Sequence, residues 1–263
     1  MTVVEKIDEC NKERFIKHIG PDVIKHVFAL YDVQHDPEHT TIHAVFEKND
    51  LRGYVLLYTG TEVPSIILEC EEEIAETLIG YAPKDHFVIH APPSMLRPVK
   101  RRFPNAKIYV ENWMLIRKEN AKFVSSKLVK RLNTEEDASK FAQLVLSRKD
   151  RPSTYMKKYV DWITKMPIYG VFKDEVMVSY AGSFIQMPQI WMIGGVYTDP
   201  KYRNKGYALL ATSAVTKEAL ERAEMAALFV RSDNHPAISV YEKIGYRKIG
   251  EKLWVDVGTG LKP

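Results

Sequence analysis

The chain has 263 residues, a net charge of +4 at neutral pH, 45% hydrophobic residues and 27% charged residues. This length allows one large or two modest domains with a sizeable core, and the composition is that of an ordinary soluble globular protein. The mild charge, with no dense basic stripe, argues against a nucleic-acid-binding protein, and no apolar run reaches membrane-spanning length.

The N-terminal segment and the cysteines indicate the compartment. Met1 to Asp8 is charged throughout, unlike a signal peptide. Cys10 and Cys70 have neither metal-ligand spacing nor a disulfide framework, so we expect buried or inert thiols and no metal site. The basic cluster at 100–102 is typical of a solvated helix end. The sequence therefore predicts a cytoplasmic protein whose partners include neither membrane nor nucleic acid.

The N-terminal half is predicted to alternate strands and helices. A strand at 44–49 precedes a strand pair, and Pro64 stands directly before the apolar run 65–68. Four further elements are expected: a helix at 71–81, a strand at 87–91, a helix at 94–103 and a strand at 107–117. The charged stretch 117–122 is the expected junction, which divides the chain into domains at 1–120 and 121–263.

The C-terminal half contains the clearer series of elements. Residues 133–137 have capping residues followed by acids, which is typical of a helix start. The expected elements are a strand at 123–132, that helix, a hairpin at 168–184 turning at 173–175, a strand at 189–198, a helix at 206–223, a strand at 227–231, a helix at 234–245 and a strand at 248–257. This order predicts an α/β fold, a mixed sheet with helices on both faces.

The most informative motif lies between the strand that ends at Thr198 and the helix that begins at Gly206. Arg203, Gly206 and Ala208 place a cation and two residues with little or no side chain at a helix start. Unpaired backbone N–H groups and the positive end of the helix dipole suit a phosphate or pyrophosphate there. The other interpretation is a solvated basic loop. The glycine patterns of P-loop and Rossmann sites are absent from the sequence.

A second motif runs from Asn234 to Tyr246. Asn234 is a suitable N-cap and Gly245 a suitable C′ residue. The apolar residues between them recur at the spacing of a buried helix face: Ala237, Val240, Tyr241 and Ile244.

Together the two motifs resemble the signatures of the GCN5-related N-acetyltransferase (GNAT) superfamily, Arg/Gln-x-x-Gly-x-Gly/Ala and Asn-x-x-Ala-x-x-x-Tyr-x-x-x-Gly-Phe/Tyr. The resemblance implies the GNAT fold in the C-terminal half and acetyl-CoA as co-substrate. It implies that Tyr241 is catalytic, donating a proton to the departing sulfur. It also implies a set of acetyl-CoA-binding residues: Val196, Tyr197, Thr198, Arg203, Asn204, Lys205, Gly206, Tyr207, Ala208 and Asn234. Strand packing, helix packing and N-capping are the structural alternatives for Val196, Tyr241 and Asn234.

The sequence pattern of the N-terminal half weakly resembles that of the C-terminal half. Residues 44–49 resemble residues 170–175, and a strand pair follows each. The phosphate-binding loop has no counterpart, because Cys70-Glu71-Glu72-Glu73 stands where Arg203 to Gly206 stands in the second half, and three acids would repel a pyrophosphate. We therefore expect a degenerate GNAT-like domain that shapes or covers the site. The arrangement resembles the two-domain, FR47-like branch that includes glycine N-acyltransferase-like proteins.

The general base is not identified by the sequence. The strand 190–198 contains Gly194-Gly195, which suggests a bulge or a ligand against the backbone, but it has no carboxylate and no histidine. Glu175, His235 and Asp161 are candidates that are equally explained as surface groups, and a water chain is a further possibility. The segment 148–166 is cationic and aromatic and stands where the family covers its acceptor, so it would suit a carboxylate-bearing amine. A basic solvated helix is the alternative interpretation of the same segment.

The expected function is acetyl-CoA-dependent transfer of an acetyl group to a primary amine of a small molecule, amino acid or peptide. The alternative is a non-catalytic acyl-CoA-binding sensor or interaction module, which the missing carboxylate keeps open. A homodimer is among the assemblies that the sequence allows.

Overall fold

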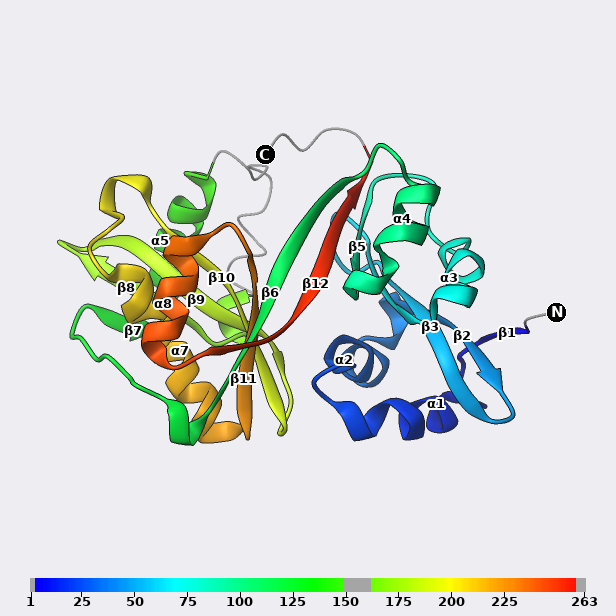
Figure 1. Cartoon of the computed structure of the whole chain (residues 1–263). Coiled ribbons are helices and arrows are strands. Elements are labelled where there is room, and N and C mark those ends of the chain that lie inside the picture. The colour runs from blue at the N-terminus through cyan, green and yellow to red at the C-terminus, as the bar shows by residue number, and fades with distance from the viewer. Residues whose placement is uncertain (1–2, 149–161, 259–263) are drawn as a thin grey trace. The chain divides into compact units, whose positions relative to one another are not determined.

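The computed structural model describes residues 3–148 and 162–258 and divides the chain into two compact units (Figure 1). Of the described residues, the first unit comprises 3–112 and 250–258, and the second comprises 113–148 and 162–249. Two long strands, β6 (Lys107–Arg117) and β12 (Arg247–Val257), each contribute residues to both units. The sequence placed the junction at 120/121, in the charged loop after β6, whereas the contacts divide the chain within the strand itself.

The first unit contains five complete strands and four α-helices among its described residues. In chain order these are β1 (Val4–Lys6), α1 (Lys12–Ile19), α2 (Val27–His35), β2 (Thr40–Glu47), β3 (Asp50–Tyr58), β4 (Ser65–Cys70), α3 (Glu72–Ile79), β5 (Phe87–Ala91) and α4 (Leu96–Arg102). Its strand order is β1-β2-β3-β4-β5-β12. The pairs are antiparallel except β4–β5, which is parallel.

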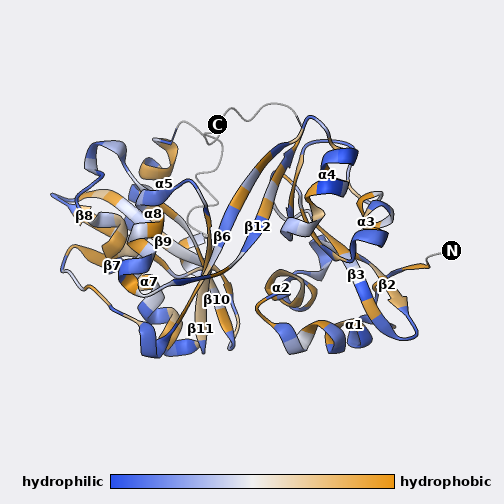
Figure 2. Cartoon of the chain, viewed as in Figure 1, coloured by the Kyte–Doolittle hydropathy of each residue, from blue (hydrophilic) through white to orange (hydrophobic). Residues whose placement is uncertain are grey.

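Two helix pairs cover the sheet of the first unit. The residues of α3 and α4 form one hydrophobic core with β3, β4, β5 and β12. On the other face, Phe15 of α1 meets the ring of Tyr54 edge-on, with the ring centroids 5.2 Å apart. Figure 2 shows hydrophilic and hydrophobic stretches alternating along the helices, as expected for helices with one buried face.

The predicted elements of the first unit are confirmed from β2 onward, including the full extent of β6. The helix predicted at 94–103 is a 3₁₀ turn at Pro93–Met95 followed by α4, which ends in the solvated cluster 100–102. Helices α1 and α2 were not predicted. Cys10 is exposed, so of the two expected alternatives, a buried or an inert thiol, the structure excludes the first for this residue. Cys70 is half-buried, and burial raises its pKa to about 12, so it is an unreactive thiol at neutral pH.

The second unit is a mixed sheet with helices on both faces, as the sequence predicted. Its elements after β6 are β7 (Val129–Arg131), α5 (Glu135–Leu146), β8 (Ile168–Lys173), β9 (Val176–Gln186), β10 (Ile190–Thr198), α7 (Tyr207–Arg222), β11 (Met225–Arg231), α8 (His235–Ile244) and the first residues of β12. The strand order is β6-β11-β10-β9-β8-β7. Helices α7 and α8 pack in one core, and α5 packs in a separate core with Met177 and Tyr180 of β9.

Local signals set several boundaries in this unit. Thr134 caps α5 through a capping box with Asp137, as the sequence indicated. The hairpin turns at Asp174 and Glu175, both with positive φ. The predicted strand at 123–132 was wrong for most of its length. The amide of Val124 donates to Oγ of Ser213 on α7 at 2.7 Å, so this segment runs along a helix instead of joining the sheet. In the part of the chain that the structure describes, no helix is long and apolar enough to cross a membrane.

Candidate active site

Strand β10 is interrupted by a bulge at its glycine pair. Its antiparallel register with β9 shifts between Met192 and Ile193 and again between Gly194 and Tyr197. Gly195 has φ +64°, a conformation that side-chain-bearing residues rarely adopt. A Cβ on Gly194 would lie 2.6 Å from the ring of Phe184. The bulge that the sequence suggested is therefore present, and Gly195 supplies the left-handed conformation within it.

Beyond the bulge, β10 and β11 no longer run side by side. Their parallel pairing covers only Ile190–Met192 against Met225–Ala227. The remaining residues of β10, from Ile193 to Thr198, have no register partner on β11. Their backbone groups on this edge are consequently not used for pairing with β11, which leaves main-chain donors and acceptors for a ligand that lies along the strand.

The loop after β10 turns twice through left-handed conformations. Asp199 caps a 3₁₀ turn by accepting a hydrogen bond from the amide of Lys201 at 2.8 Å. Asn204 then has φ +61° and Gly206 has φ +80°. Alternation of this kind turns successive N–H groups toward a concave surface that binds anions. A Cβ on Gly206 would meet nothing within 4 Å, so this glycine supplies the backbone conformation and leaves open space beside it.

Helix α7 begins at this loop with its first amides uncapped. Its N-cap residue is Gly206, which has no side chain to accept a hydrogen bond, and the first turn contains no acid. The N–H groups of Tyr207 and Ala208 are among the donors that have no acceptor within the helix. The helix is 16 residues long, so its dipole adds positive potential at this end. Arg203 and Lys205 are exposed at the same place.

Arg203 folds back toward the strand. Its Nε donates to the carbonyl oxygen of Thr198 at 3.3 Å. Lys205 instead lies over the ring of Tyr202, with Nζ 5.6 Å from the centroid. The loop thus combines two cations, a concave backbone and a helix N-terminus, which fits a pyrophosphate better than the alternative of a loop that is merely solvated.

The side chains of the predicted residues do not all face one way. Val196 and Tyr207 pack against the core that contains Tyr241, so these three share the α7 side of the sheet. Tyr197 packs in the α5 core on the opposite face. Its carbonyl oxygen accepts a hydrogen bond from Oγ of Ser179 at 2.9 Å. A ligand on the α7 side could therefore meet Tyr197 only through its backbone.

Asn234 is the N-cap of α8, which is one of the two roles that the sequence suggested for it. Its side-chain oxygen accepts from the amide of Ala237 at 3.3 Å, and the residue is exposed. This bond uses the carbonyl oxygen and leaves the NH₂ group as a donor toward a ligand.

Tyr241 is a buried phenol whose hydroxyl has no partner among the described residues. The residue is 6% exposed, and burial raises its pKa to about 12. The neighbouring Tyr246, also buried, forms a 2.8 Å hydrogen bond between its hydroxyl and Oγ1 of Thr216. Tyr241 makes no such bond among the described residues. A protonated, unpaired hydroxyl is what a proton donor to a leaving thiolate requires.

The candidates for a general base are surface groups. Glu175 is exposed in the β8–β9 turn, where Lys140 contacts it at 3.5 Å. His235 is exposed at the start of α8. Asp161 lies outside the described residues. None of these observations assigns a base, and a water chain is still the simplest route for the amine proton.

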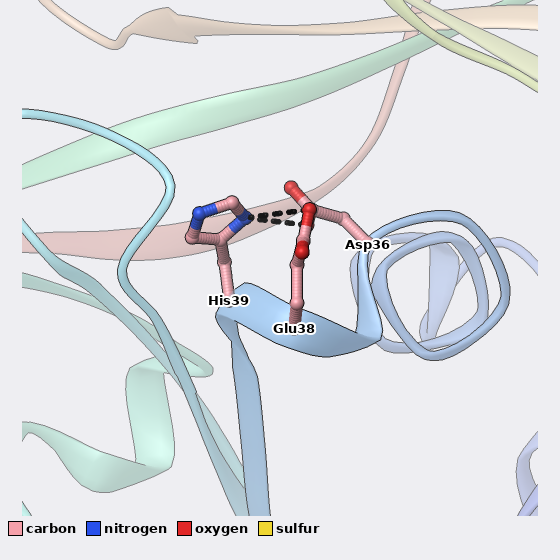
Figure 3. A group of neighbouring side chains, drawn as sticks. All are labelled: Asp36, Glu38 and His39. Atoms are coloured by element: carbon pink, nitrogen blue, oxygen red, sulfur yellow. Dashed lines mark hydrogen bonds and ion pairs between the residues drawn. The ribbon is translucent and has the colours of Figure 1, made fainter.

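Among its described residues, the first unit contains a cluster with metal-ligand chemistry, Asp36, Glu38 and His39, which the sequence pattern did not indicate (Figure 3). Their ligand atoms lie within 4.8 Å of one another. Nδ1 of His39 is 2.6 Å from Asp36, and the hydroxyl of Tyr58 donates to the same carboxylate at 2.7 Å. Burial acts to raise the pKa of Asp36, but these hydrogen bonds outweigh it and lower that pKa. The bond to Asp36 raises the pKa of His39. The cluster is accounted for as a hydrogen-bonded ion pair.

Residues 168–255 match the family model described as FR47-like protein. A search of curated protein sequences returns no significant match. Among solved structures, a Drosophila protein aligns over 98% of this chain and 99% of its own length at 13% identity, with a TM-score of 0.75. A GCN5-related N-acetyltransferase from Sphaerobacter thermophilus aligns over 99% and 96% at 12% identity, with a TM-score of 0.67.

A tandem GNAT protein from the clavulanic acid biosynthesis pathway also aligns over the whole chain. It covers 98% of this chain and 100% of its own length at 11% identity, with a TM-score of 0.61. Residues 168–255 are therefore similar to FR47-like proteins, and the chain as a whole shares its fold with these solved structures, which include a tandem GNAT protein.

Proposed function

We propose that the protein is an N-acetyltransferase that moves an acetyl group from acetyl-CoA to a primary amine. The observation that carries the proposal is the junction of β10 with α7, where a bulged strand edge without a β11 partner continues into an anion-binding loop and an uncapped helix. The strand edge suits the amide-bearing pantetheine arm, and the loop suits the pyrophosphate.

The reaction needs two proton transfers. The amine nitrogen attacks the thioester carbonyl carbon, a C–N bond forms, and the C–S bond breaks with its electron pair on sulfur. The nitrogen loses one proton to water or a base, and the thiolate takes one proton, so charge and atoms balance. A backbone N–H near Val196 is suited to stabilise the carbonyl oxygen as negative charge develops on it.

Tyr241 is the proposed donor to the sulfur. Its pKa of about 12 keeps the phenol neutral at physiological pH, so the proton is present when the thiolate forms. The same high pKa means that the hydroxyl acts mainly as a hydrogen-bond donor that stabilises the departing thiolate, with full transfer completed as water enters.

The test is acetyl-CoA binding by calorimetry, followed by thiol release with a panel of amines and peptides. Micromolar binding with thiol release is expected. No binding would reject the proposed site, because the loop and strand edge would then have no acyl-CoA to hold.

A non-catalytic acyl-CoA-binding module is the second candidate. It is favoured by one observation, the absence of a carboxylate or histidine from Ile190–Thr198. This candidate predicts binding of acetyl-CoA with no thiol release above the background rate of hydrolysis, for every amine in the panel.

A further inference from the structure

We infer that Ser179, a buried serine of β9, positions acetyl-CoA by fixing Thr198 at the open edge of β10, so that the threonine hydroxyl accepts a hydrogen bond from an amide N–H of the pantetheine arm. The inference rests on the proposed acetyltransferase function and adds to it a residue that neither sequence motif contains. Ser179 acts on the ligand only through Thr198, so it is a positioning residue and not a catalytic one.

Ser179 lies directly opposite Thr198 in the antiparallel register of β9 with β10. The residue is 0% exposed. Its Oγ donates to the carbonyl oxygen of Tyr197 at 2.9 Å and lies 2.7 Å from Oγ1 of Thr198. Both partners belong to the part of β10 that has no partner on β11. One buried side chain therefore holds two consecutive residues of the strand whose edge is open.

The two bonds of Ser179 fix the direction of the threonine hydroxyl. A hydroxyl has a single proton to donate, and a carbonyl oxygen can only accept. Since Ser179 gives its proton to the carbonyl of Tyr197, the bond between the two hydroxyls runs from Oγ1 of Thr198 to Oγ of Ser179. Oγ1 of Thr198 has then used its own proton and retains only lone pairs. A ligand group that bonds to this oxygen has to be a donor.

The backbone of Thr198 faces the open edge. The amide of Asp199 donates to the carbonyl oxygen of Val178 on β9 at 3.0 Å. Because neighbouring residues of an antiparallel strand point their backbone groups to opposite edges, the N–H and C=O of Thr198 point away from β9. Nε of Arg203 donates to that C=O at 3.3 Å. The arginine thus occupies the acceptor that a plain strand edge would present, whereas the N–H has no partner on β11.

Thr198 consequently presents one donor, its backbone N–H, and one acceptor, its hydroxyl oxygen. A secondary amide carries the complementary pair, a C=O that accepts and an N–H that donates. The pantetheine arm of CoA contains amides of this kind. The side chain of Thr198 lies on the same face of β10 as that of Val196, the α7 side, because residues two apart in a strand share a face. An amide that lies along this edge can therefore satisfy both groups of Thr198.

Ser183 provides an internal comparison on the same strand. It is 1% exposed, and its Oγ donates to the carbonyl oxygens of Ile185 at 3.0 Å and Met192 at 2.9 Å. Met192 lies in the part of β10 that still pairs with β11. Ser183 thus connects β9 to β10 as Ser179 does, but outside the open edge. It separates the effect of losing a buried hydroxyl from the effect of losing the position of Thr198.

The experiment measures the binding of acetyl-CoA by calorimetry. The proteins are the wild type, Ser179→Ala, Thr198→Val, Thr198→Ser and the control Ser183→Ala. The second set of ligands consists of acetyl-CoA analogues in which each pantetheine amide N–H in turn is replaced by an ester oxygen, which cannot donate. Unfolding curves of every protein show whether it is folded and how much stability it has lost.

One of the analogues should bind to the wild type about 3- to 10-fold more weakly than acetyl-CoA, the usual effect of one neutral hydrogen bond. Ser179→Ala and Thr198→Val should each weaken acetyl-CoA binding by a similar factor. Their affinity for that analogue should stay within about twofold of the wild type, because its N–H is already absent. Thr198→Ser, which keeps the hydroxyl, should bind like the wild type. Ser183→Ala should lose stability without losing affinity.

Two results would overturn the inference. Equal weakening of acetyl-CoA binding in Ser179→Ala and Ser183→Ala would assign Ser179 to packing. A loss in Ser179→Ala that is the same for acetyl-CoA and for every analogue would show that Thr198 accepts no amide N–H. Absence of acetyl-CoA binding to a folded wild type would instead reject the proposed function, and the inference with it, and the unfolding curve distinguishes that case from a misfolded protein.

Discussion

The two units contain the same strand-to-helix arrangement, but they differ in the segment that connects the strand to the helix. In the first, β4 and β5 pair in parallel through three residues, Ser65–Ile67, just as β10 and β11 pair through Ile190–Met192 in the second. However, β4 passes to α3 through Glu71 alone, whereas β10 reaches α7 through the long loop from Asp199 to Gly206. The topology is shared, but of these two strand-to-helix connections only the one in the second unit has the length and the left-handed turns of the proposed anion-binding loop.

In the first unit, a buried ion pair occupies the place where β5 no longer pairs with β4 or β12. Glu69 lies beyond the last β4 residue that pairs with β5, and Lys252 lies beyond the last β12 residue that does so. Their side chains form a buried ion pair, with Glu69 4% exposed and Lys252 8% exposed. A thioester in this position would have to displace that pair. In this protein the shared topology forms a candidate site only in the unit where the loop is long and the strand edge is left open.

The largest effect is expected from breaking the ion pair between Glu69 and Lys252 in the first unit. Lys252→Met should destabilise the protein by about 3–5 kcal/mol, because the Glu69 charge is then buried without its partner. Denaturant unfolding would measure this loss, and the double variant Lys252→Met with Glu69→Gln should recover most of it. Acetyl-CoA affinity of the folded protein should not change. Weaker binding would mean that the first unit contributes to the site.

The second prediction concerns the loop that only the second unit has. Arg203→Glu should weaken acetyl-CoA binding about 100-fold or more, because it replaces a cation of the proposed pyrophosphate-binding loop by an anion. Arg101→Glu is the matched control, an exposed charge reversal on α4 of the first unit. Calorimetry on both variants decides the matter, and an unchanged affinity in Arg203→Glu would remove the loop from the site.

The third prediction is that the stability of the first unit depends more strongly on pH than the stability of the second. Burial is the main cause that lowers the pKa of His26 and of His90 to about 4, and the positive charges of Lys25 and Lys252 add to it. Both lie in the first unit. Below pH 6.5 the unfolded chain takes up protons that the folded unit does not, so stability falls as the pH drops from about 6.5 to 4.

Between pH 7 and pH 5 the free energy of unfolding should fall by about 2 kcal/mol, after allowance for the partial exposure of His90. Hydrogen exchange at the two pH values would measure it, with the first unit losing protection and the second changing little. Equal loss in both units would show that other groups control the acid response.

The smallest effect is expected from a pair of tyrosine variants. Tyr241→Phe should slow thiol release about tenfold without loss of stability, since its hydroxyl has no partner to leave behind. Tyr54→Phe in the first unit should do the reverse. It removes the hydroxyl that lies 2.8 Å from Nδ1 of His26 and should cost about 1–2 kcal/mol with no change in turnover. Steady-state kinetics and unfolding curves on both variants test the contrast.

Much of the second unit could be predicted because its signals are local. The capping box of Thr134 with Asp137, the hairpin turn at Asp174 and the C′ glycine Gly245 each act within a few residues. The same holds for the glycine pair of β10 and for the motif from Arg203 to Ala208, whose conformations are set by missing side chains and by the helix start. The caps, the turn, the bulge and the start of α7 were predicted correctly from residue type and spacing alone.

Tertiary structure decided the features that depend on distant residues. Glu69 and Lys252 meet although 183 positions separate them, and Ser213 holds the segment that alternation had predicted as a strand. The orientation of Tyr197 away from Tyr241 likewise follows from which core each face of the sheet joins. Sequence by itself determined where the backbone turns, caps and bulges, because these energies are local. Only packing decided which side chains come together, because burial and charge pairing depend on the whole fold.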